Sequence, residues 1–184
     1  MLRPSYPIIT DRLILRPFTE DDVDAMHAYQ SLPAVTRYLY WDVRDRAGTA
    51  AALARRTSMT LLEKEGDVLV LAVLLRETGE LVGDVNLWWL SEANKQGEFG
   101  FVFNPDYHGR GYAREAAREM LRLGFEGLGL HRIIGRCDGR NEASARLMAK
   151  LGMRREAHFV ENELVKGEWT DEIVYAMLAT EWPS

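Results

Sequence analysis

The sequence has a single cysteine, Cys137, so no disulfide can form within the chain. It contains no apolar run that approaches the roughly 18 residues needed to span a bilayer, and no secretory signal, internal repeat or low-complexity segment. Together these absences predict a protein of the reducing cytoplasm without a membrane partner. The 184 residues suit one domain, 1–184, which is long enough to bury a core without disulfides.

The net charge is small, −5, which argues against broad nucleic-acid binding. That charge is distributed unevenly along the chain. Residues 108–155 hold eleven basic residues (Arg and Lys) and five acidic ones (Asp and Glu). Residues 1–107 hold eleven basic and sixteen acidic residues, and residues 156–184 hold one basic and seven acidic. This pattern indicates either separate surfaces for an anion and a cation or ordinary solvated faces.

The first half of the chain predicts a strand, two helices and three further strands. Strand-like alternation covers residues 12–18, and a helix then opens at the candidate N-cap Thr19, with Asp22 as its capping-box partner. An aromatic-rich connection, 31–41, leads to a second helix within 45–64. Short turns join the next three strands, which form an antiparallel meander because parallel neighbours would need long crossovers; they cover 67–75, 81–90 and 97–103.

The second half predicts helices alternating with strands. Small and apolar residues at helical spacing indicate a helix over 113–124, and a strand over 131–137 makes that helix the crossover of a βαβ-type unit. Asn141 is the candidate N-cap of a second helix, which ends at Gly152. A final strand pair closes the chain, at 153–164 and 168–178. The predicted fold is α/β, with helices on the faces of a mixed sheet.

Two glycines, Gly109 and Gly111, lie between the third meander strand and the crossover helix. Such a turn directs backbone N–H groups outward at the positive end of a helix, which suits a phosphate group. An ordinary tight turn has the same spacing. The stretch is not a Rossmann fingerprint, because Arg114 stands where the third glycine belongs and a meander precedes it. No P-loop motif is present.

These stretches together resemble the GCN5-related N-acetyltransferases (GNAT), and most closely the ribosomal-protein N-terminal acetyltransferase (RimJ/RimL-like) branch. The family signature, Gln/Arg-x-x-Gly-x-Gly/Ala, is matched by HGRGYA, in which His108 replaces the Gln or Arg. The resemblance covers residues 8–178 and also includes TDRLILRPFTEDD, GEFGFVF, NEASARLMAKLGM and GEWTDEIVYAML. It implies the GNAT acyl-CoA N-acyltransferase fold, a mostly antiparallel sheet of six to seven strands with about four helices.

The resemblance implies acetyl-CoA as the acetyl donor. Its pyrophosphate would lie on the backbone N–H groups of the glycine turn and the first helical residues. Its pantetheine arm would pair with the strand backbone at Phe101–Phe103 and receive a hydrogen bond from Asn141. The implied CoA-binding residues are Phe101, Val102, Phe103, His108, Gly109, Arg110, Gly111, Tyr112, Ala113 and Asn141.

Direct acetyl transfer needs a base that deprotonates the amine and a donor to the departing thiolate. Glu98 is the candidate base, because the family often has an acid on that strand; a solvated strand carboxylate is the alternative. Ser144 matches the serine of the branch's Asn-x-x-Ser motif and is the candidate donor, although a small residue on a packed helix face has the same pattern. Met148, where many relatives have tyrosine, cannot donate. Cys137 has no evident activating partner, so no acyl-enzyme is expected.

Aromatic residues are candidates to line an acceptor pocket, although aromatic side chains are also common in cores; they are Tyr38, Tyr40, Trp41 and Trp88, with Trp89 beside them. The four histidines have no metal-ligand spacing, so no metal is proposed. The predicted activity is direct acetyl transfer to a primary amine, either a protein N-terminus or a small cationic amine. The alternative is a module that binds acyl-CoA without turnover, and the resemblance also allows a homodimer.

Overall fold

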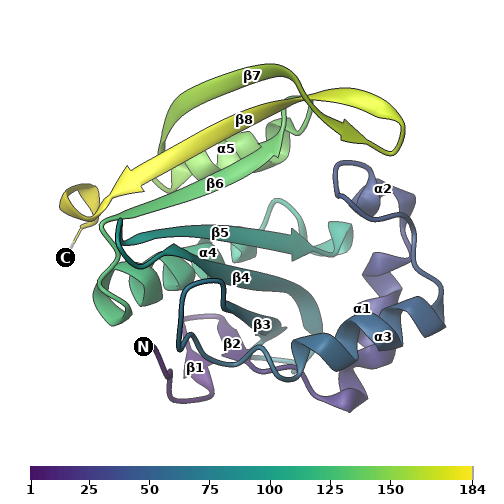
Figure 1. Ribbon diagram of the computed structural model, residues 1–184. Coiled ribbons are helices and arrows are strands. Elements are labelled where there is room, and N and C mark those ends of the chain that lie inside the picture. Colours follow the sequence, from purple (N-terminus) through teal and green to yellow (C-terminus); the bar gives the residue numbers. More distant parts are fainter. Residues whose placement is uncertain (184) are drawn as a thin grey trace.

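The structure, a computed structural model, describes residues 1–183, which build an eight-stranded sheet with helices on both faces (Figure 1). The strand order is β1-β2-β3-β4-β5-β6-β8-β7. Every neighbouring pair is antiparallel except β5 and β6, which are parallel. The strands are β1 (Ile8–Ile9), β2 (Leu13–Arg16), β3 (Val68–Leu75), β4 (Leu81–Ser91), β5 (Gln96–Phe103), β6 (Arg132–Asp138), β7 (Arg154–Val165) and β8 (Glu168–Leu178).

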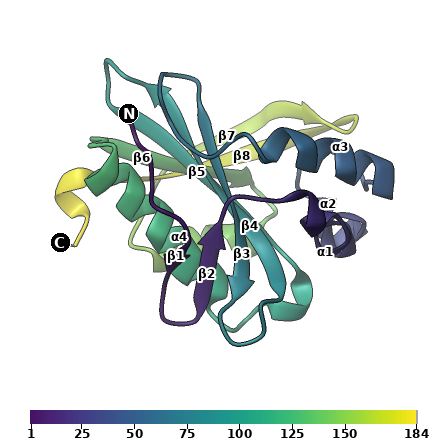
Figure 2. The same cartoon turned by 90° about the horizontal axis from the view of Figure 1, so that it is seen from below.

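Helices cover the two faces of the sheet unequally. They are α1 (Val23–Gln30), α2 (Pro33–Thr36), α3 (Arg46–Arg56), α4 (Tyr112–Arg122) and α5 (Glu142–Lys150). The main core cluster joins the sheet to α4 and α5, and a second cluster joins it to α1 and α3. Figure 2 shows α4 and α3 on opposite sides of the central strands. Both faces of β3 are covered there. Its sequence, VLVLAVLL, accordingly contains no polar residue, instead of the alternation expected of a strand with one face in solvent.

The predicted α/β class and mixed sheet are confirmed, with two additions. The eighth strand is β1, whose two residues are too few to give a recognisable pattern. The fifth helix is α2, a single turn within the aromatic-rich connection that begins at Pro33. A 3₁₀ turn, η1 (Glu20–Asp22), separates Thr19 from α1, and the Asp22 carboxylate accepts the Thr19 backbone N–H at 2.8 Å.

The crossover helix α4 begins at Tyr112, one residue earlier than predicted, and continues into a π-helical turn, η3 (Leu123–Gly127). Its predicted apolar face is buried against the sheet. A Cβ on Gly124 would lie 2.5 Å from the Ile133 Cδ1 atom, so this glycine permits the close approach of the helix to β6. The small residues of this helix therefore set its distance from the strands.

Candidate active site

β5 and β6 pair at only three positions, from Gln96–Arg132 to Glu98–Ile134, and then separate (Figure 1). Beyond Glu98, β5 stays paired with β4 alone. The Asn104 backbone N–H donates to the Val82 carbonyl oxygen at 2.9 Å. By antiparallel alternation, the N–H and C=O groups of Phe99, Phe101 and Phe103 therefore point away from β4. We call this row of backbone groups, from residues 99 to 103, the β5 edge.

The glycine turn lies at the end of the β5 edge and leads into α4. Gly109 and Gly111 both adopt left-handed backbone conformations, with φ of 76° and 82°, and Gly111 is the N-cap of α4. A Cβ on Gly109 would have no heavy atom within 4 Å, so open space lies in front of it. Both positions favour glycine for two reasons: a left-handed φ strains other residue types, and a missing Cβ leaves room for a ligand to approach the backbone. We call residues 108–113 the cradle.

His108, the departure from the family signature, contacts the β5 edge. Its Nε2 atom lies 3.2 Å from the Phe103 carbonyl oxygen. With the proton on Nε2, the imidazole donates to the last carbonyl of this strand edge. His108 therefore joins the cradle to the β5 edge through its side chain.

The sequence places Arg110, Arg114 and Arg118 four residues apart, which predicts one basic stripe along the crossover helix. Arg110 precedes the first helical residue and stacks on Tyr107, with its Cζ atom 5.6 Å from the ring centroid. Arg114 is exposed on α4, and Arg118 stacks on Trp182 at 5.0 Å. The prediction of one stripe formed by all three arginines was wrong, because the helix starts only at Tyr112.

Glu98 lies where β5 and β6 begin to separate, and Arg136 of β6 holds it. The Arg136 Nε atom is 3.0 Å from Glu98 Oε1, and its Nη1 atom is 3.0 Å from Glu172 Oε1 on β8. Burial opposes the charge of Arg136, but the hydrogen bond and charge of Glu98 raise its pKa overall. Glu98 Oε2 is buried and has no hydrogen-bond partner within residues 1–183. Arg136 thus anchors one carboxylate oxygen of Glu98, and the other is buried without a partner in this part of the chain.

The sequence analysis missed Arg136. The parallel register aligns Glu98 with Ile134, so Arg136 follows two residues later on the same face of the sheet. Only a known strand register, and not the residue pattern, could have placed it beside Glu98.

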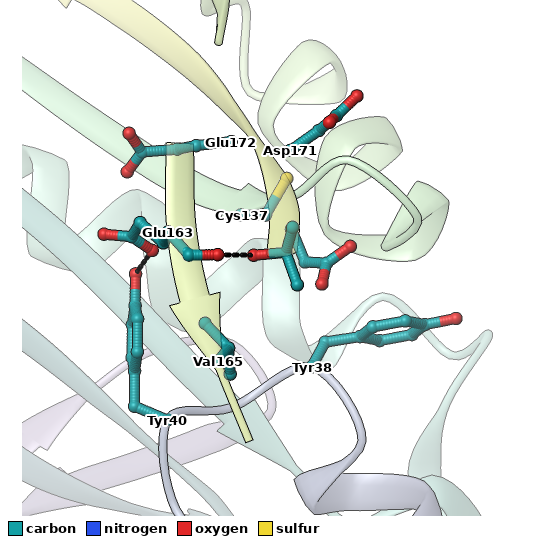
Figure 3. Close-up of a pocket in the computed structure, with 9 residues that line it drawn as sticks. Tyr38, Tyr40, Cys137, Glu163, Val165, Asp171 and Glu172 are labelled. Atoms are coloured by element: carbon teal, nitrogen blue, oxygen red, sulfur yellow. Dashed lines mark hydrogen bonds between the residues drawn. The ribbon is translucent and has the colours of Figure 1, made fainter. Parts of the chain in front are cut away.

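The β7–β8 hairpin meets the end of α2, and the segment that follows it, beside this cluster. The Tyr40 hydroxyl donates to Glu163 Oε2 at 2.6 Å (Figure 3), and the Lys166 ammonium donates to the Thr36 carbonyl oxygen at 2.7 Å. Burial, with Glu163 as a hydrogen-bond acceptor, raises the pKa of Tyr40, so its hydroxyl remains protonated. Tyr40 also lines a small cavity of about 20 Å³ with Tyr38, Cys137, Asp138, Glu163, Val165, Thr170, Asp171 and Glu172.

The aromatic candidates occupy different environments. Trp88 is 47% exposed and lies directly opposite Glu98 across the β4–β5 pair, and Tyr40 is 65% exposed. Trp41 packs against the α1–α3 core, with the Arg44 guanidinium 4.7 Å from its ring centroid. Trp89 is buried in the core, so its suggested place in a pocket was wrong. Alternation along β4 explains the difference between Trp88 and Trp89.

Asn141 and Ser144 form the start of α5. The predicted N-cap is confirmed, because the Asn141 side-chain oxygen accepts the Ser144 backbone N–H at 3.1 Å. Ser144 is half-buried, and its hydroxyl has no hydrogen-bond partner in the described part of the chain. Met148 is buried, and its sulfur fills the space above Gly135 together with the Phe99 ring.

Cys137 is half-buried in β6 and lines the cavity of Figure 3. Burial raises the pKa of its thiol to about 11. At neutral pH the group is therefore protonated, whereas the thiolate is the nucleophilic form. This environment does not favour an acyl-enzyme.

Known proteins resemble the chain over most of its length. Residues 12–154 match the family described as acetyltransferase (GNAT) domain. YnaD, an N-acetyltransferase of Bacillus subtilis, is 37% identical and aligns with 95% of this chain and 98% of its own. A GNAT-family acetyltransferase from Bacillus anthracis has a crystal structure with a TM-score of 0.85 at 34% identity, covering 95% of this chain and 99% of that one.

Two more distant relatives from Escherichia coli, each 23% identical, are named for different acceptors. The alignment with spermidine N(1)-acetyltransferase covers 86% of this chain and 82% of the relative. The alignment with ribosomal protein uS5-alanine N-acetyltransferase covers 97% of this chain and 94% of the relative. Within residues 1–183, no helix is both long and apolar enough to cross a membrane.

Proposed function

Because the chain belongs to the GNAT family and is an N-acetyltransferase, we propose that it transfers an acetyl group from acetyl-CoA directly to a cationic primary amine. The observation that carries this proposal is the β5 edge, which pairs with no strand within residues 1–183 and leads into the cradle. An amide-containing pantetheine arm can add to such an edge as a strand does, and a pyrophosphate suits the N–H groups at the start of α4. The open space before Gly109 fits this ligand.

The experiment that tests the activity follows CoA thiol release from acetyl-CoA on addition of candidate amines. Amine-dependent release is expected. Calorimetry with CoA, performed in parallel, reports the binding step alone. CoA binding without thiol release for any amine in a broad panel would instead support a binding module without turnover.

In the proposed reaction, Glu98 accepts a proton from the acceptor ammonium through water, and the Oε2 atom that has no hydrogen-bond partner in residues 1–183 receives it. The neutral amine nitrogen then forms a bond to the thioester carbonyl carbon. N–H groups of the β5 edge stabilise the negative charge that develops on the carbonyl oxygen. The carbon–sulfur bond breaks, the attacking nitrogen releases its second proton to the departing thiolate so that the products are the amide and the CoA thiol, and the Ser144 hydroxyl provides a hydrogen bond to the sulfur as it leaves. The raised pKa of Cys137 supports direct attack rather than a thioester on the enzyme.

The acceptor is proposed to be cationic because negative charge surrounds the point where β5 and β6 separate. Glu98, Glu163 and Glu172 converge there, and among residues 1–183 Arg136 is the one cation within hydrogen-bonding distance of two of them. A negative surface raises the local concentration of cations. It also raises the pKa of a bound ammonium, which makes a base more necessary. Trp88 and Tyr40 would contact the apolar part of the acceptor.

The two acceptor classes left open are a peptide with a basic N-terminal segment and a polyamine-like molecule. The relative named for ribosomal protein uS5 supports the first class and the ribosomal-protein branch, whereas the relative named for spermidine supports the second. Equal identity to both relatives gives neither class an advantage.

We expect kcat/KM to fall as salt is added, because screening shortens the field of the acidic cluster to about 8 Å at physiological ionic strength. A panel of primary amines matched in size but differing in charge measures this preference, with initial rates recorded at low and high salt. The matched control is an amine with no charge beyond its own ammonium group, whose rate should change less with salt. A preference for acidic acceptors, or equal salt dependence for all amines, would contradict the proposed cationic acceptor.

Ser144→Ala should lower kcat roughly 100-fold with little change in CoA affinity, because a hydrogen bond to the leaving thiolate strengthens in the transition state. Single-turnover rates with saturating acetyl-CoA measure the effect. Ser144→Thr keeps the hydroxyl and the Asn141 cap, so it serves as the control and should retain much of the rate. If chemistry limits turnover and the kcat of Ser144→Ala equals that of the parent, the Ser144 side chain contributes only to packing.

A further inference from the structure

Arg12 reaches the cradle from the other end of the chain. It lies just before β2, and its Nη1 atom donates to the Arg110 carbonyl oxygen at 2.8 Å. That carbonyl belongs to the peptide unit between Arg110 and Gly111. The Arg12 guanidinium also stacks on the Tyr112 ring, with its Cζ atom 4.8 Å from the centroid. One side chain therefore contacts both sides of the N-cap of α4.

Glu115, in the first turn of α4, fixes the position of Arg12. Its Oε2 atom lies 2.8 Å from Arg12 Nε and 2.7 Å from Nη2, and its Oε1 atom accepts from the Arg12 backbone N–H at 2.8 Å. The Thr10 hydroxyl donates to the same Oε1 atom at 2.6 Å. Burial opposes ionisation, but these hydrogen bonds lower the pKa of Glu115 overall. The carboxylate is thus charged at neutral pH and holds the guanidinium by two nitrogens.

The geometry of a trans peptide connects this contact to the cradle. The C=O and N–H groups of one peptide unit point in opposite directions. Holding the Arg110 C=O toward Arg12 therefore directs the Gly111 N–H away from Arg12. The flanking glycines have the widest choice of backbone conformation of any residue type, so this peptide unit needs an external contact to keep one orientation.

We propose that Arg12 is a positioning residue for the proposed pyrophosphate site: by binding the Arg110 carbonyl oxygen, it keeps the Gly111 N–H directed at the ligand. This inference rests on the proposed function, because it assumes that the cradle binds CoA. Arg12 acts through the backbone and not as a phosphate ligand, since Glu115 already neutralises its charge.

The two roles predict opposite results for Glu115→Gln. This variant leaves the Arg12 charge in place but removes the carboxylate that holds it. A positioning role predicts weaker CoA binding, whereas a direct phosphate contact predicts tighter binding, because a nearby negative charge is lost. Arg12→Met removes the hydrogen bond to Arg110 and should also weaken CoA binding, by roughly tenfold for one hydrogen bond.

Calorimetry with CoA measures these affinities for the parent, Arg12→Met and Glu115→Gln. Turnover of S-acetylpantetheine, which lacks the pyrophosphate, is the second measurement, and thermal unfolding checks that each variant is folded. We expect weaker CoA binding and an unchanged kcat/KM for S-acetylpantetheine in both variants. Equal losses with both donors, or tighter CoA binding by Glu115→Gln, would overturn the inference. Failure of the parent to bind CoA would overturn the proposed function as well.

Discussion

Gly111→Val is expected to weaken CoA binding roughly 100-fold or more, because at least two charge-assisted hydrogen bonds from the cradle would be lost. A Cβ at this N-cap would lie 3.3 Å from the Arg12 Nη2 atom, so a branched side chain would displace the guanidinium that holds the Arg110 carbonyl oxygen and would disturb the proposed phosphate site. It would also strain the backbone, because Gly111 has a φ of 82°. Calorimetry with CoA measures the loss of affinity, and thermal unfolding separates it from the loss of stability.

The matched control for this prediction is Gly66→Val. Gly66 also has a left-handed φ, 91°, and has no heavy atom near its missing Cβ. It hydrogen-bonds to Trp89, at the opposite end of β4 from the cradle. Gly66→Val should lower stability to a similar degree and leave CoA affinity unchanged. Unchanged CoA affinity in a folded Gly111→Val variant would exclude the cradle as the pyrophosphate site.

Glu98→Gln should lower the rate at neutral pH by roughly 100-fold or more, because it keeps the shape of the side chain but removes the base. An α-amine has a pKa near 8 and a lysine amine near 10.4, so little neutral acceptor exists at pH 7 without assistance. As pH rises toward the pKa of the acceptor, the variant should recover about tenfold in rate per pH unit. A pH–rate profile of kcat/KM measures this slope.

Glu172→Gln is the control for the base. Glu172 also contacts Arg136 at 3.0 Å, so its substitution removes a negative charge from the same cluster. If the local field alone sets the rate, both variants should slow to a similar degree. If Glu98 is the base, only Glu98→Gln should acquire the steep pH dependence. A Glu98→Gln profile parallel to that of the parent would remove Glu98 from the mechanism.

The sequence predicted the elements that have a periodic or capped pattern. The α4 face, the Asn141 cap and the final hairpin all follow from local residue types. β1 has two residues and α2 has a single turn, so both are too short to show a periodic residue pattern in the sequence. Their existence depends on neighbours, because β1 is defined by its pairing with β2.

The candidate site was predictable in its backbone and less so in its side-chain contacts. Gly109 and Gly111 marked the cradle because few residues tolerate a left-handed φ. The contacts of Arg136 with Glu98 and of Arg12 with Arg110 join segments 38 and 98 residues apart. Charged residues are numerous on any surface, so their type alone does not identify their partners.

The three-position pairing between β5 and β6 has a thermodynamic consequence. It divides the sheet into a five-stranded part and a three-stranded part that share few main-chain hydrogen bonds. A ligand lying along the β5 edge would supply part of the missing ladder, and so act as a segment of the fold as well as a reactant. Ligand binding would then raise the free energy of unfolding by about 2.7 kcal/mol when the free ligand concentration is one hundred times its Kd. The supply of donor would thus set how much of the chain stays folded under stress.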